Sequence, residues 1–315
     1  MMRRFMMTAF LISMVILAGC GNGKKAESTD GRLSVVTTTG QVGDLARHVG
    51  GDHVKVTSLM GPGVDPHLYK ASAGDVERLR KADLILFNGV HLESKMGEVL
   101  ERLGSSRPTR AVAEAIPESE LLSPEGAAGT HDPHVWFDVR LWQFALGAVR
   151  DELVELDPAH AEDYQANASA YARELEKLDA HVHAQVATVP ENKRVMITAH
   201  DAFAYFGHAY NLEVRGLQGI STATEAGTAD VQDLAAFIAD RKIPALFVES
   251  SVSPRAIEAV MEAVKARGFE VRIGGEIFSD AMGDAGTPEG TYIGMVRHNI
   301  DTIAAALRGE ETHDH

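Results

Sequence analysis

The longest stretch of this 315-residue sequence without glycine or proline lies between Pro158 and Pro190. Asp157 and Pro158 open it, and these residue types favour the N-cap and the first position of a helix. A helix of about 30 residues spans roughly 45 Å, enough to cross a whole molecule. Apolar side chains form a single stripe along it, at Tyr164, Tyr171, Leu175, Leu178, Val182 and Val186. We therefore predict a linking helix over residues 158–189.

The regions before and after this helix alternate between short apolar runs and amphipathic runs. The alternation predicts an α/β fold and argues against a coiled-coil dimer, the other use of a long apolar stripe. We expect strands at residues 33–38, 54–60, 84–87, 109–112, 194–198, 212–215, 245–249 and 270–273. We expect helices at residues 42–49, 73–81, 96–103, 139–156, 228–241, 254–267 and 292–307, with a shorter one ending at residue 210.

These elements divide into two groups, one on each side of the linking helix. The chain is long enough to bury two cores, and 45% of its residues are apolar. We predict two doubly wound α/β lobes joined by one long rigid helix. The N-terminal lobe covers residues 33–157 and the C-terminal lobe residues 190–315.

The N-terminal segment has the pattern of an export signal. Arg3 and Arg4 precede an apolar run that is too short to span a membrane as a helix. The run closes with Leu-Ala-Gly before Cys20, which resembles the bacterial lipobox. We expect residues 1–19 to be a signal peptide, Cys20 to carry lipid, and residues 20–32 to form a lipidated, flexible tether.

Charge and cysteine content argue against a nucleic-acid partner and an internal disulfide. The 30 basic residues are outnumbered by 45 acidic ones, giving a formal net charge of −15. Nucleic-acid binding requires clustered basic residues, so we expect no nucleic-acid partner. Cys20 is the only cysteine, so no internal disulfide can form.

One tripeptide occurs twice, as Asp65-Pro66-His67 and as Asp132-Pro133-His134. Proline fixes its own φ and moves the preceding residue out of the α region. Each copy therefore presents its imidazole from a stiff, extended backbone, which suits metal ligation.

Four candidate ligands follow strands or strand-like runs, two in each half of the chain: His67, His134, His200 and Asp280. Ligands of open α/β sheets bind beyond the carboxyl ends of the strands, so we expect these groups to face one cleft between the lobes. Three imidazoles and one carboxylate suit zinc and accept manganese or iron(II). Protein groups then occupy all four positions, which leaves no place for an activated water. We predict one tightly held divalent ion per chain.

Several other residues have chemistry that could support the site. Carboxylates near the ligands could orient the imidazoles, but helix caps and surface roles are more common for them. They are Asp65, Asp132, Asp138, Asp201 and Glu249. A terminal tail with His313 and His315 could collect metal, although such tails are usually not part of a fold.

From about Leu33 to Leu307 the sequence resembles the TroA-like metal-binding lipoproteins, the receptor subunits of bacterial ABC importers for zinc, manganese and related ions. The resemblance implies His67, His134, His200 and Asp280 as ligands of a metal buried between two lobes joined by a rigid helix. It also implies an ABC permease and its ATPase as partners. Four segments carry the resemblance, at residues 61–69, 132–138, 198–203 and 275–286.

The predicted function is a high-affinity receptor for zinc or manganese, anchored by lipid at the cell membrane and facing the periplasm or the cell exterior. We expect a monomer without enzymatic activity. A metal-dependent hydrolase and a surface adhesin with a structural metal are the alternatives. A hydrolase would need an open coordination position and a general base, and the sequence contains no His-Glu-x-x-His motif. An adhesin would be indicated by repeats or an extended β-rich region, and neither is visible in the sequence.

The linking helix also predicts how the ion is released. Residues 159–189 contain neither glycine nor proline, so they offer no hinge. We expect local rearrangement of the ligand loops, above all at the glycine-rich residues 274–286, with little movement of the lobes.

Overall fold

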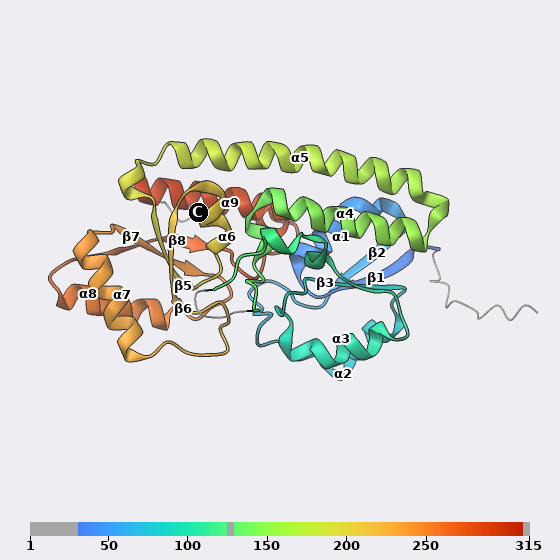
Figure 1. The fold of residues 1–315 in the computed structure, drawn as a ribbon, viewed down its shortest axis with the longest axis horizontal. Coiled ribbons are helices and arrows are strands. Elements are labelled where there is room, and N and C mark those ends of the chain that lie inside the picture. Colours follow the sequence, from blue (N-terminus) through green and yellow to red (C-terminus); the bar gives the residue numbers. More distant parts are fainter. Residues whose placement is uncertain (1–30, 125–128, 311–315) are drawn as a thin grey trace, which may run out of the picture.

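The computed structural model describes residues 31–124 and 129–310. Figure 1 shows two α/β lobes with one long helix lying across both, which confirms the predicted architecture. The predicted signal peptide, Cys20, most of the predicted tether and the tail from His313 to His315 lie outside the described residues.

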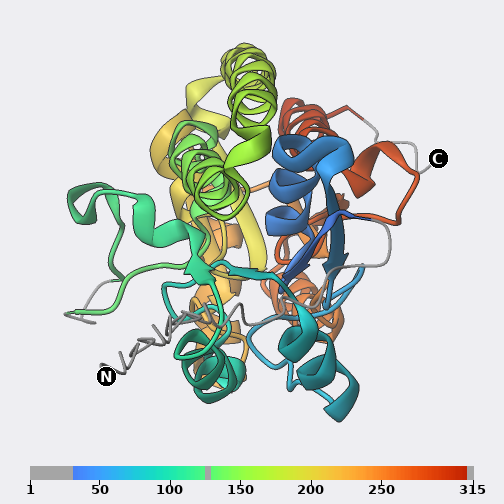
Figure 2. The same ribbon diagram turned by 90° about the vertical axis from the view of Figure 1, so that its right-hand side faces the viewer.

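The N-terminal lobe is built on a parallel sheet with the strand order β2-β1-β3-β4. Its strands are β1 (Leu33–Thr37), β2 (Val54–Ser58), β3 (Leu84–Phe87) and β4 (Thr109–Ala111). Its helices are α1 (Gly40–Gly50), α2 (Ala73–Lys81), α3 (Gly97–Gly104) and α4 (Val139–Leu156). Figures 1 and 2 place α1 and α4 on one face of the sheet, with α2 and α3 on the other. The sheet is therefore doubly wound, and the carboxyl ends of its strands lie at one edge.

The C-terminal lobe repeats this arrangement with two pairs of parallel strands. In the first pair β5 (Val195–His200) joins β6 (Glu213–Gln218), and in the second β7 (Ala245–Glu249) joins β8 (Arg272–Ile277). Strands β5 and β7 lie side by side, so the two pairs form one layer. Its helices are α6 (Ala204–Tyr210), α7 (Thr228–Arg241), α8 (Arg255–Ala266) and α9 (Tyr292–Arg308).

Helix α5 (Ala161–Ala187) is the predicted linking helix. Its 27 residues correspond to roughly 40 Å, and all six predicted stripe positions are buried. The helical segment begins at Pro158 as a 3-10 turn, Pro158–His160, that leads directly into the α-helix. The Asp157 carboxylate accepts a hydrogen bond from the Tyr164 hydroxyl and lies 2.7 Å from the Nδ1 atom of His160. It therefore binds side chains instead of capping the helix amides.

The apolar core beneath α5 is continuous between the lobes. Leu175 of α5 shares it with Val149 of α4 in one lobe and Ile303 of α9 in the other. Two smaller cores lie on the far faces, one beside α2 and α3 and one beside α7 and α8. Since a close-packed core resists sliding, packing against α5 holds the two lobes together.

Strand β8 is longer than the sequence pattern predicted. It includes Gly274 and Gly275, which we expected in the flexible ligand loop. A register shift in the β7 to β8 ladder leaves Gly274 as a bulge, and a Cβ atom there would lie 2.8 Å from side-chain atoms of both Phe247 and Ala306. Glycine at this position lets helix α9 pack closely on the strand. The ligand loop therefore begins only after Ile277.

Candidate metal centre

The four predicted ligands come together between the lobes. His67 lies in the loop after β2, and His134 lies in the segment before α4. His200 is the last residue of β5, whereas we expected it just after the strand, and Asp280 follows β8. One ligand atom from each residue lies within 4.8 Å of all the others.

The distances within this group are those of atoms that face one centre. The Nε2 atoms of His67 and His134 are 3.2 Å apart. One Asp280 oxygen lies 3.3 Å from the His134 Nε2, and the other lies 3.4 Å from the Nε2 atoms of both His67 and His200. None of the four residues is more than 3% exposed. A buried group of this kind requires a cation or protons to balance its charge.

Both Asp-Pro-His copies form the same local structure. In the first copy the backbone N–H of His67 donates to Asp65 Oδ1 at 2.8 Å, and in the second that of His134 donates to Asp132 Oδ1 at 2.9 Å. Each aspartate therefore closes a tight turn around its proline and fixes the backbone that carries the imidazole. The repeat in the sequence is thus a repeat in geometry.

Two of the five flanking carboxylates contact imidazole nitrogens. Asp132 lies 2.7 Å from Nδ1 of His134, and Glu249 lies 2.6 Å from Nδ1 of His200. When an imidazole donates through Nδ1, its Nε2 lone pair points away and is free to bind a metal. Both carboxylates therefore orient the ring so that Nε2 faces the centre.

The other three carboxylates have different roles. Asp138 caps helix α4 and accepts from the N–H groups of its first turn. The backbone N–H of Asp201 donates to the Gln218 carbonyl. The second oxygen of Asp65 accepts a hydrogen bond of 2.5 Å from Thr222, which lies in the loop after β6. This contact joins a ligand loop of the N-terminal lobe to the C-terminal lobe.

Further contacts across the lobes hold the segment that carries Asp280. The indole N–H of Trp136 donates to the Ser279 carbonyl at 3.2 Å, and the Tyr292 hydroxyl donates to the Trp136 carbonyl at 2.7 Å. Asn299 of α9 bonds both backbone groups of Phe278. Trp136 is also part of the main core, and the sequence did not reveal its contact with the Asp280 segment. The contact of Asn299 with Phe278 could have been suspected from the sequence, because Asn299 is an amide within the apolar face of helix α9.

The metal-free site is electrically asymmetric. Burial lowers the pKa of His67 to about 4. Burial also opposes the charge on His134, but the carboxylates of Asp132 and Asp280 outweigh it and raise the pKa of His134 to about 9. Glu249 and Asp280 raise the pKa of His200 in the same way. Burial favours a neutral Asp280, yet the His200 and His134 imidazoles hold its pKa well below the usual range.

This donor set fits a divalent cation. Three imidazole nitrogens and a carboxylate meet the preference of zinc for four nitrogen and oxygen ligands, and they also suit manganese or iron(II). Asp280 directs one oxygen toward His134 and the other toward His67 and His200, so it can bind through either or both. A pocket of about 470 Å³ between the lobes has Asp280 in its wall, beside Met60 and Met282.

The contacts to Nδ1 predict the effect of two conservative substitutions. We expect Asp132→Asn and Glu249→Gln each to weaken metal binding by about 10- to 100-fold, because a neutral amide no longer stabilises the oriented imidazole. Asp138→Asn is the matched control, since asparagine also caps helices well and Asp138 contacts no ligand. Competition with a chromophoric chelator measures all three affinities. Equal affinities for Glu249→Gln and Asp138→Asn would contradict the orienting role.

Comparisons with known proteins identify the family. Residues 35–306 match the family described as zinc-uptake complex component A, periplasmic. The chain is 50% identical over 307 residues to the manganese-binding lipoprotein MntA of Bacillus subtilis, covering 98% of this chain and 100% of that protein. It is 55% identical over 285 residues to the zinc-binding protein TroA of Treponema pallidum, covering 90% of this chain and 92% of TroA.

The fold agrees as well. The solved structure of the periplasmic zinc-binding protein TroA from Treponema pallidum superposes with a TM-score of 0.86 at 56% identity. The superposition covers 88% of this chain and 99% of that one. The chain therefore belongs to the zinc-uptake component A family and is a TroA-like metal-binding receptor of the ABC importer type.

Proposed function

We propose that this protein captures one divalent metal ion through His67, His134, His200 and Asp280 and delivers it to the permease of an ABC importer. The observation that supports this most directly is the burial of four ligand groups from both lobes within 4.8 Å of one another. Both relatives described above are named for metal binding, one for manganese and one for zinc. An ABC permease and its ATPase are the proposed partners.

The proposed cargo is zinc or manganese, with iron(II) as the third candidate. The imidazole-rich donor set favours zinc in intrinsic affinity, but availability in the cell overrides that order. Metal analysis of the protein purified from its own host identifies the ion. Calorimetric titration of the metal-stripped protein then tests the stoichiometry, for which we expect one ion per chain. Two equivalent sites would contradict the proposal.

The two alternatives receive less support. The family is one of solute-binding receptors, and both relatives are named as metal-binding proteins. A hydrolase needs an open coordination position for water, whereas here four protein groups point at one centre. We therefore propose a non-enzymatic receptor that acts as a monomer.

The proposed domain boundaries are those expected from the sequence. We propose residues 1–19 as signal peptide, 20–32 as lipidated tether, 33–157 and 190–315 as lobes, and 158–189 as the linking segment. Names of related lipoproteins support an exported, membrane-anchored protein. Among residues 31–124 and 129–310, no helix is both long and apolar enough to cross a membrane.

Anchoring through Cys20 predicts a simple separation of effects. We expect Cys20→Ser to release the protein from membranes into the soluble fraction, because the lipid chains would supply its membrane affinity. Metal affinity should not change, since the tether precedes the first strand, which begins at Leu33. Cell fractionation and mass spectrometry of the mature protein test this. An unmodified Cys20 in the wild-type protein would refute the lipid anchor.

The continuous core beneath α5 predicts little movement of the lobes. We expect the radius of gyration from small-angle scattering to be nearly the same with and without metal. Hydrogen exchange should differ mainly in the ligand segments, around His200 and around Asp280. A domain rotation of tens of degrees on metal loading would show that α5 bends and that the shared core is not continuous in the open state.

A further inference from the structure

The turn after strand β3 has an unusual backbone. Gly89, Val90 and His91 all have positive φ, at 86°, 51° and 66°. Left-handed conformation is common for glycine but unfavourable for other residues, above all for β-branched valine. Such a backbone persists only when surrounding contacts hold it.

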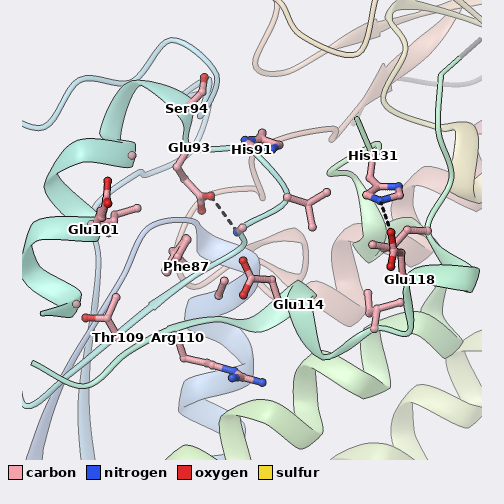
Figure 3. A pocket seen from close by; sticks show the side chains of 18 of the residues that line it. Phe87, His91, Glu93, Ser94, Glu101, Thr109, Arg110, Glu114, Glu118 and His131 are labelled. Atoms are coloured by element: carbon pink, nitrogen blue, oxygen red, sulfur yellow. Dashed lines mark hydrogen bonds and ion pairs between the residues drawn. The ribbon is translucent and has the colours of Figure 1, made fainter. Parts of the chain in front are cut away.

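A buried carboxylate holds the turn. Glu93 is 3% exposed, and its carboxylate accepts hydrogen bonds from the N–H groups of Asn88 and Gly89 at 2.8 and 3.1 Å. It also accepts from the Thr38 hydroxyl, just beyond β1, at 2.7 Å. Figure 3 shows the Glu93 carboxylate directed at a backbone nitrogen of the turn. Successive N–H groups that converge in this way form an anion site, here filled by a side chain of the same loop.

Val90 packs against the core on the inner side of the turn, and the outer side is open. A pocket of about 820 Å³ is lined by Gly89, Val90 and His91, and Glu101 lies in another wall. Figure 3 shows His91 and Glu101 around this pocket. The Leu92 N–H donates to the Gly89 carbonyl at 3.1 Å and closes the turn over Val90 and His91, while the hydrogen bonds to Glu93 fix its start at Asn88 and Gly89.

This turn also fixes the backbone of a proposed metal ligand, His134. The side-chain amide of Asn88 donates to the Pro133 carbonyl at 3.0 Å. That carbonyl belongs to the same peptide group as the N–H of His134, which donates to Asp132. The peptide that precedes His134 is thus fixed at both ends, once by Asp132 and once by Asn88. Asn88 is fully buried, so few other positions are open to its side chain.

We propose that Asn88 and Glu93 are positioning residues for the metal site: Glu93 holds the strained turn, and through it Asn88 fixes the peptide that aims His134. The inference rests on the proposed metal-binding function and extends it to residues that touch no ligand atom. It explains why a turn with two strained residues stands beside the carboxyl ends of β1 and β3.

The test compares Asn88→Ala and Glu93→Gln with Glu101→Gln in the full-length protein. Glutamine at position 93 would oppose one backbone N–H with its own N–H group, and alanine at position 88 frees the Pro133 carbonyl. We expect both to weaken zinc binding and to speed zinc dissociation by about tenfold. Glu101→Gln lies in the same pocket, is exposed, and should match the wild type.

A second readout separates positioning from a general loss of stability. The visible spectrum of the cobalt(II)-loaded protein reports ligand geometry, so it should change in Asn88→Ala and Glu93→Gln at temperatures where both remain folded. Because Asn88 and Glu93 act on the same peptide group, the double variant should bind zinc only slightly more weakly than the weaker-binding of the two single variants. Thr38→Val should show a smaller loss, and Thr38→Ser should restore it, because serine keeps the hydroxyl that donates to Glu93.

Two outcomes would overturn the proposal. Unchanged affinity and cobalt spectrum in Asn88→Ala, with only a lower unfolding temperature, would reduce the network to a structural role. Multiplicative losses in the double variant would show that the two residues act independently. Failure of the wild-type protein to bind any divalent ion would instead contradict the proposed function itself.

Discussion

Replacing His200 by alanine is expected to weaken metal binding by about a hundredfold. Zinc sites with four protein ligands bind with about 10 to 16 kcal/mol, so one ligand accounts for roughly 3 kcal/mol, or about a hundredfold in affinity. Water or another side chain cannot easily take the place of the His200 imidazole, because the residue is fully buried at the end of β5. The variant also leaves the buried Glu249 carboxylate without the imidazole that lies 2.6 Å away.

The matched control for this variant is His208→Ala. His208 lies in α6, shortly after His200, and is exposed. Its loss should leave affinity unchanged within about twofold, the usual range for a surface substitution. His67→Ala should behave like His200→Ala, and loss of His313 or His315 should have nearly no effect. Calorimetric titration by zinc and manganese measures all of them. Tight binding in both His67→Ala and His200→Ala would disprove the four-ligand site.

Metal binding is also expected to depend steeply on pH. Near pH 7 the metal-free site holds protons on His134 and His200, whose pKa values are raised, and none on His67, whose pKa is about 4. A cation must displace both protons from nitrogens that face the centre. Binding should therefore release about two protons per ion, and affinity should rise by up to about a hundredfold per pH unit. Calorimetry in buffers of different ionisation enthalpy counts the protons released.

The same shifts predict an opposite trend for the stability of the metal-free protein. A histidine whose pKa is raised on folding stabilises the fold below its unfolded pKa of about 6.5. That contribution is lost as the pH rises through the folded value, which is about 9 for His134. Unfolding by guanidinium should thus need less denaturant at pH 9.5 than at pH 7 without metal. With metal bound, the difference should shrink or reverse.

For the calorimetric experiment, proton release close to zero would show that the His134 and His200 imidazoles are neutral before metal arrives.

Local features of the sequence were enough to predict much of this protein. The linking helix followed from a stretch without glycine or proline and from a stripe at Tyr164, Tyr171, Leu175, Leu178, Val182 and Val186, all of which are buried. The four proposed ligands followed from their places after strands, because parallel strands bring their carboxyl ends to one edge. These features depend on spacing and on neighbouring residues, which the sequence shows directly.

Only the tertiary structure decided which side chains support the ligands. Asp132 stands two residues from its imidazole, but Glu249 lies 49 residues from His200, and Asn88 lies 45 residues from the Pro133 carbonyl that it binds. Among several similar carboxylates, neither residue type nor spacing selects the ones that meet a ring nitrogen. That choice depends on how the lobes pack and on which buried polar groups would otherwise lack a partner.

The same reason explains why Gly274 lies in a strand and why Asp157 does not cap the helix amides. The close approach of Ala306 to Gly274 and the contact between Asp157 and Tyr164 arise from packing between elements and from side-chain geometry. Residue preferences describe how a short segment behaves alone. In this protein they predicted most of the elements, whereas the contacts that aim the proposed ligands were decided by the assembled fold.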